Sequence, residues 1–250
     1  MKNLIAITSL LAAGTFLANA ASSPILFNFG STDVDGWTTC SQSSGKDFSF
    51  TADEVTIALS GAAGGNITSG NFAAVSPAPI LNSSVLEDFS ETIGSDVSFD
   101  SNVFNTGLTN GANKGGTLTI SGLAANQLYT FYYVFGSKKN ANDNTHAINL
   151  SSALSTSNIA TASYVVNSGA YQDVDATGTV SIGNDTIAIV KVENVLSSAT
   201  GTLTVGTMNG QRDNINAFAI IAVPEPSAFG LLAGLGALAL AGTRRRRRKA

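Results

Sequence analysis

Short apolar runs separated by turn residues are the feature that most constrains the fold of residues 21–222. About eleven such runs are rich in β-branched and aromatic residues and end at Gly, Asn, Ser or Asp. The strongest spans residues 129–135, and residues 186–192 alternate with a period of two. Apart from a short helical turn expected at residues 85–91, we find no helical stripe. The pattern predicts an all-β, antiparallel β-sandwich.

Alternation within residues 129–135 also predicts which side chains form the core. Tyr129, Phe131, Tyr133 and Phe135 share one face, while Tyr132 points to the opposite one. We expect this strand and residues 117–120 to form a pair of core strands, joined across residues 123–127.

The N-terminal segment, residues 1–20, has the three parts of a secretory signal. Lys2 gives a positive start, residues 4–17 are mostly apolar, and Ala18-Asn19-Ala20 supplies small residues. Signal peptidase is therefore the expected first partner, with cleavage between Ala20 and Ala21. A buried N-terminal helix is the alternative, and the lack of amphipathic spacing speaks against it.

The C-terminal segment, residues 223–250, has three parts of its own. Pro224, Glu225 and Pro226 close the polar part of the chain, and an uncharged stretch follows to residue 243. A membrane-spanning helix needs roughly 17 to 25 such residues, so a span over about 227–243 is predicted. A cationic cluster beside a span stays in the cytoplasm, which leaves the body outside. That cluster consists of Arg244, Arg245, Arg246, Arg247, Arg248 and Lys249.

Charge argues against reading the basic run as a nucleic-acid site. Seven of the 13 Lys and Arg residues lie in the two terminal segments, whereas 16 of the 17 Asp and Glu residues lie in the body. The body therefore carries a net charge near −10, which repels nucleic acid. The basic run also directly follows an apolar span, as membrane topology requires.

The C-terminal segment resembles the PEP-CTERM sorting signal of exported bacterial proteins. Pro224-Glu225-Pro226, the apolar helix and the arginine-rich end carry this resemblance. It implies processing near Pro-Glu-Pro by an exosortase, a membrane cysteine transpeptidase, in an envelope rich in exopolysaccharide. It also implies a transient stay in the inner membrane, followed by the cell surface or the medium. It implies no biochemical activity.

The body resembles jelly-roll sandwiches of the galactose-binding and malectin-like kind. The resemblance rests on the order of an opening strand, a turn between two central strands, and a closing strand. These segments are residues 25–30, 118–123, 128–131, 135–137 and 215–220. It implies a jelly-roll-like fold for the whole body.

The residues of the body offer no complete catalytic constellation, so a non-enzymatic protein is expected. His146 is the only histidine, and no Gly-x-Ser-x-Gly elbow occurs. Cys40 is the only cysteine, and we expect it to be buried; pairing with another chain is the alternative. One His and one Cys cannot complete a zinc site. The acidic cluster Glu87, Asp88 and Glu91 could hydrolyse a glycoside only if two carboxylates faced each other.

Calcium is the only cofactor for which the sequence offers ligands. Asp33 and Asp35 lie in an acidic turn, and Asp143 lies in the Asn-rich segment 140–144. Carboxylate and amide oxygens are the ligands that Ca²⁺ prefers. Asp and Asn also favour turns for local reasons, and the EF-hand pattern is incomplete.

Three aromatic residues are candidates for contact with extracellular polysaccharide. Trp37 follows the acidic turn, Tyr132 lies opposite the core-facing aromatics, and Tyr171 lies in a polar segment. Core packing or loop anchoring is the more common fate of such residues. We therefore rank a non-enzymatic surface or matrix protein first, a carbohydrate-binding module second and a glycan hydrolase third.

Overall fold

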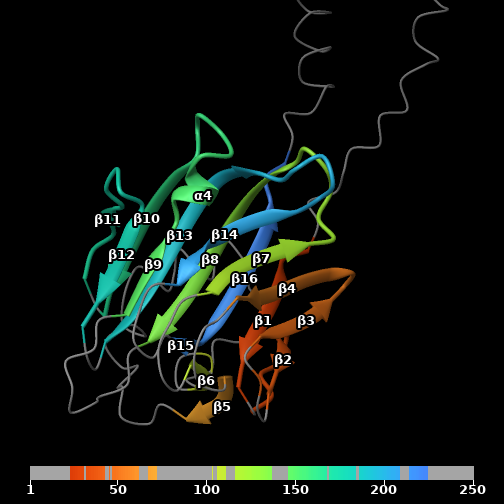
Figure 1. The fold of residues 1–250 in the computed structure, drawn as a ribbon, viewed down its shortest axis with the longest axis vertical. Helices are drawn as coiled ribbons and strands as arrows, with labels where there is room; N and C mark the ends of the chain where they lie inside the picture. Colours follow the sequence, from red (N-terminus) through yellow and green to blue (C-terminus); the bar gives the residue numbers. More distant parts are fainter. Residues whose placement is uncertain are drawn as a thin grey trace, which may run out of the picture. The chain divides into compact units, whose positions relative to one another are not determined.

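The alternating runs form two large facing β-sheets and one small sheet in the computed structural model of the chain (Figure 1). The structure describes residues 23–30, 32–42, 45, 47–61, 67–71, 103, 106–110, 116–136, 146–167, 169–183, 186–208 and 214–224. The compact unit of the fold spans Ser23–Val223.

The first large sheet has seven strands in the order β11-β10-β13-β8-β16-β1-β2. All of its pairs are antiparallel except β1 with β2. Its strands are β1 (Ile25–Phe29), β2 (Thr38–Cys40), β8 (Leu128–Gly136), β10 (Thr161–Val166), β11 (Gln172–Asp173), β13 (Ile187–Leu196) and β16 (Ala217–Ala222).

The second large sheet has six strands in the order β12-β9-β14-β7-β4-β3. Its strands are β3 (Phe48–Ala52), β4 (Val55–Ser60), β7 (Gly116–Ser121), β9 (His146–Asn149), β12 (Thr179–Ile182) and β14 (Leu203–Met208). A three-stranded sheet adds β5 (Ile67–Asn71), β6 (Thr106–Asn110) and β15 (Asn214–Ile215), and one short helix, α4 (Ser151–Leu154), follows β9.

Successive strands pass from one large sheet to the other. β7 and β9 belong to the six-stranded sheet, whereas β8 and β10 belong to the seven-stranded sheet. We expected residues 117–120 and the strand from residue 129 to form a pair of core strands joined across residues 123–127. The two strands are joined there, but they lie in different sheets and are not hydrogen-bonded to each other. β7 pairs with β4 and β14, and β8 pairs with β13 and β16, so the two strands face each other across the core.

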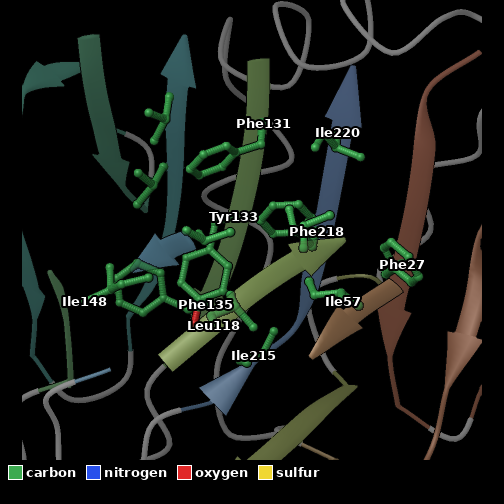
Figure 2. Close-up of a cluster of buried hydrophobic side chains, with 14 of the residues drawn as sticks. Phe27, Ile57, Leu118, Phe131, Tyr133, Phe135, Ile148, Ile215, Phe218 and Ile220 are labelled. Atoms are coloured by element: carbon green, nitrogen blue, oxygen red, sulfur yellow. The ribbon is translucent and has the colours of Figure 1, made fainter. Parts of the chain in front are cut away.

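The predicted aromatic face of β8 forms the centre of the core (Figure 2). Phe131, Tyr133 and Phe135 are at most 3% exposed. The Phe131 ring stacks on Phe218 of β16 with centroids 5.3 Å apart. Leu118 of β7, from the opposing sheet, lies in the same cluster. The prediction of a mostly β fold in two sheets, with this face inside, is confirmed.

The opposite face of the seven-stranded sheet is also buried, which the sequence did not indicate. Side chains there form a second apolar group, which we name the outer cluster. Two of its members, Val34 and Trp37, come from the loop between β1 and β2, and a third is Val103. The other buried members are Leu26, Tyr132, Val134, Val165, Ile187, Ile189, Ala217 and Ala219. The central strands therefore lie between two apolar layers.

Several strands were missed because their sequences are short or polar. β2 and β11 have three and two residues, and β5 and β6 carry Gly, Asn, Ser and Thr. β3 joins β4 through Asp53 and Glu54, both with positive φ, where Gly or Asn is the usual choice. The strand expected at residues 97–99 and the helical turn at 85–91 lie outside the described residues.

Within the described ranges, no helix is long and apolar enough to cross a membrane. The signal expected at residues 1–20 and the span expected at about 227–243 both lie outside those ranges.

Cys40 is buried in the core, as expected. Its side chain is 0% exposed, and burial raises the pKa of the thiol to about 12. Because the thiolate is the reactive form, both the burial of the sulfur and the raised pKa reduce the reactivity of Cys40.

We predict that Cys40 reacts with a thiol reagent at pH 8 at least about 100-fold more slowly in the native body than in denaturant. Absorbance of the released chromophore gives both rates. Native labelling as fast as labelling of the unfolded chain would show that this thiol is accessible and free to pair with another chain.

A second prediction concerns Gly201, which has φ +67°. A Cβ there would lie 2.0 Å from the carbonyl oxygen of Leu123, whose N–H donates to the Gly201 carbonyl at 3.0 Å. We expect Gly201→Ala to reduce the free energy of unfolding by about 2 kcal/mol or more in denaturant titrations.

Gly61 provides the matched control, because its φ is +74° but nothing lies within 4 Å of the position that a Cβ would take. Gly61→Ala should therefore cost only the backbone strain, about 1 kcal/mol. Equal losses for the two variants would contradict the role given to the close approach at Leu123.

Candidate functional site

The two ends of the body lie side by side at one end of the seven-stranded sheet. β1 and β16 are antiparallel neighbours, with Ile25 opposite Ile220 and Asn28 opposite Ala217 (Figure 1). This register places the beginning of β1 beside the end of β16. The first and last described strands of the body therefore begin and end at neighbouring positions.

Two residues hold Val223, which directly follows β16, and we name them the exit clamp: Gln127 and Leu128. The backbone N–H of Val223 donates to the carbonyl of Leu128 at 2.9 Å. The Gln127 side-chain amide donates to the carbonyl of Val223 at 2.7 Å and to that of Leu128 at 3.2 Å. The exit clamp thus engages both backbone polar groups of Val223.

Pro224 ends the backbone hydrogen bonding of the strand. It is exposed and has no N–H, so it cannot continue the hydrogen bonding of β16. Among the described residues, the last backbone hydrogen bond of β16 therefore comes one residue before the Pro-Glu-Pro sequence. Glu225, Pro226 and the basic residues from Arg244 to Lys249 lie outside the described residues.

Gln127 is itself held by Ser197, a buried serine that directly follows β13. Ser197 is 2% exposed, and its hydroxyl donates to the carbonyl of Ala124 at 2.6 Å. The Gln127 N–H donates to that hydroxyl at 3.0 Å, and the Ser197 N–H donates to the Gln127 carbonyl at 3.0 Å. These bonds fix the backbone of Gln127, so its side chain needs little further ordering to reach Val223.

Tyr129 completes the support for this connection. Its hydroxyl accepts a hydrogen bond from the Ala124 N–H at 2.9 Å. Burial raises the pKa of Tyr129, and the bond from Ala124 acts in the opposite direction. The phenol therefore stays protonated at neutral pH. Sequence reasoning missed both Gln127 and Ser197, because a lone Gln or Ser in a loop carries no pattern.

The three aromatic candidates for glycan contact all belong to the outer cluster. Trp37 is 7% exposed and Tyr132 is 0% exposed, while Tyr171 is partly buried and packs against the cluster. The structure therefore places all three residues in or against one apolar layer of the seven-stranded sheet, with Trp37 directly before the edge strand β2 and Tyr171 directly before the opposite edge strand β11. Two of them, however, are packed as core and do not present an open ring face.

Polar side chains continue the outer cluster toward the edge of the sheet. Strand register places Tyr132 beside Lys191, Lys191 beside Ser163, and Ser163 beside Asp173. The Lys191 ammonium lies 5.8 Å from the centroid of the Tyr132 ring and 3.4 Å from a carboxylate oxygen of Glu193. Aromatic, cationic, hydroxyl and carboxylate groups thus adjoin on one surface.

The structure describes two of the three residues predicted to bind calcium. Asp33 and Asp35 are exposed in the loop between β1 and β2, and Asp143 lies outside the described residues. In the part of the chain that the structure describes, no group of three or more His, Cys, Asp or Glu residues could hold a metal ion. Calcium binding stays a prediction.

The residues considered for catalysis are not brought together among the described ranges. His146 lies in β9, where its backbone pairs with Ile182 of β12. Glu87, Asp88 and Glu91 lie outside those ranges. The absence of enzymatic activity also stays a prediction.

Comparisons with known proteins give one specific match. No curated protein matches the chain. A solved structure of TmCBM61 in complex with β-1,4-galactotriose is similar with 8% identity and a TM-score of 0.30, over 68% of this chain and 90% of that one. Residues 222–248 match the family described as the PEP-CTERM protein-sorting motif. The chain therefore carries a PEP-CTERM protein-sorting motif at residues 222–248, as its sequence predicted.

Proposed function

We propose that this chain is a non-enzymatic surface or matrix protein that is exported, held in the inner membrane by its C-terminal segment, and then processed by an exosortase. The observation that carries the proposal is the match of the sorting motif to residues 222–248, beginning at the last residue of β16. The body outside the membrane would be a jelly-roll-like sandwich.

The position of the motif supports processing without loss of the fold. Every described strand lies before Val223, so a cut at or after Pro224 removes none of them. At the other end, β1 begins at Ile25, so removal of residues 1–20 by signal peptidase also leaves every strand in place. Both cuts would leave a complete sandwich.

A variant with Pro224, Glu225 and Pro226 all replaced by Ala tests the proposal in the native host. We expect the wild-type chain to be converted to a shorter form at the surface or in the medium. The variant should stay full length in the inner membrane, because the enzyme no longer finds its site. Pulse-labelling followed by fractionation and immunoblotting measures both.

Gln172→Ala, an exposed change on β11, serves as the control and should be processed normally. Equal processing of the triple variant and the wild type would contradict the proposal.

A second candidate function is binding of envelope polysaccharide by the outer cluster. It is favoured by one observation: Trp37, Tyr132 and Tyr171 all lie in or against the outer cluster, and the Lys191 ammonium lies 5.8 Å from the centroid of the Tyr132 ring. Aromatic faces with adjoining polar groups are the elements that sugars require. The partly buried Tyr171 and the rim around Lys191 are the accessible portion.

We expect the purified body to bind polysaccharide extracted from the host envelope, and Tyr171→Ala or Lys191→Ala to weaken binding by about tenfold. Isothermal titration with and without calcium measures this, and an unchanged Tm shows that each variant is folded. Trp37→Ala is unsuitable because the loss of a buried Trp destabilises the fold. No binding by the wild-type body under either condition would exclude this function.

A further inference from the structure

The strand that leads to the sorting motif is an interior strand of its sheet, with a partner on each side. β16 pairs with β8 along residues 217–222 and with β1 along residues 217–220. Enzymes that cut peptides commonly bind them as extended strands, through the backbone groups on either side of the cut. The backbone upstream of Pro224 is already committed to the sandwich.

Residues 221–223 differ from the rest of β16 in how they are held. The ladder to β1 ends at Ile220, so among the described residues these three are paired with β8 alone. On that side, Ile221 lies opposite Thr130, Ala222 lies opposite Tyr129, and the exit clamp holds Val223. These three residues can therefore detach from β8 at a lower free-energy cost than the residues of β16 that precede them.

We infer that the exit clamp gates exosortase processing, and that the enzyme acts on a minor form in which residues 221–223 have detached from β8. This inference rests on the proposed function. Gln127 is the gating residue because it holds the carbonyl of Val223, the last backbone acceptor before Pro224-Glu225-Pro226. It acts on the substrate and not in the chemistry of cleavage.

The size of the effect follows from the strength of the contact. The net contribution of one intramolecular hydrogen bond corresponds to a change of about 2- to 10-fold in an equilibrium constant. Loss of the bond from Gln127 to Val223 should therefore raise the detached population, and with it the processing rate, by about 2- to 10-fold.

The sharpest variant is Gln127→Glu, which keeps the shape of the side chain but replaces the donating amide by a carboxylate. A carboxylate accepts hydrogen bonds only, so it cannot hold the Val223 carbonyl. Gln127→Ala gives a second version of the same loss. In the full-length chain in its native host, pulse-chase labelling should show faster conversion for both variants and no change for Gln172→Ala.

General destabilisation is controlled separately. Ile57→Val removes one methylene from a fully buried position in the six-stranded sheet, which does not carry the exit clamp. It should lower Tm without changing the processing rate. Equal acceleration by Ile57→Val would show that global unfolding, and not the exit clamp, limits processing.

A spacer tests the gate independently of Gln127. Inserting Gly-Ser-Gly-Ser between Val223 and Pro224 supplies free backbone to the enzyme, so processing should speed up. Gln127→Glu should then have no further effect. An unchanged rate on adding the spacer, or slower processing in Gln127→Glu, would overturn the inference. If the wild-type chain itself is never shortened, the proposed function fails instead.

Discussion

The structure depends on the burial of β8 on both faces and its pairing on both edges. Its core face meets the six-stranded sheet through Phe131, Tyr133 and Phe135, and its other face enters the outer cluster through Tyr132 and Val134. β13 and β16 saturate its backbone on either side. A strand held in this way has no edge open to solvent, and it fixes the position of everything that pairs with it.

The same strand fixes where the body ends. The carbonyl of Leu128, at the beginning of β8, accepts the last backbone bond of the sandwich from Val223. Pro224 follows at once, and a proline cannot extend the ladder. The bond from the Val223 N–H and the missing N–H of Pro224 together mark where the folded body ends. The last hydrogen-bonded residue of the sandwich is therefore followed directly by the first residue of Pro-Glu-Pro.

Much of the fold could be predicted because its causes are local. Period-two alternation identified β8 and β13 and assigned the core face of β8 correctly. The structure adds that Ala188, Val190 and Val192 of β13 lie in the same core. Local patterns do not say what covers a face. The outer cluster needs Val34, Trp37 and Val103, which reach β8 from distant parts of the chain.

The site was predictable to the same degree. The sorting motif is a continuous segment, so the order of its three parts in the sequence was sufficient to identify it. The exit clamp joins Gln127 to a residue 96 positions later, and nothing near Gln127 in the sequence indicates that partner. The aromatic candidates all lie in or against the outer cluster, and the burial of Trp37 and Tyr132 there reflects packing that alternation cannot reveal.

The intact mass of the protein recovered from its own host distinguishes a processed chain from a permanently anchored one. We expect a chain that begins at Ala21 and ends between Val223 and Pro226, found at the cell surface or in the medium. A mass that still includes Arg244 to Lys249, found in the inner membrane, would contradict it and make the C-terminal segment a permanent anchor.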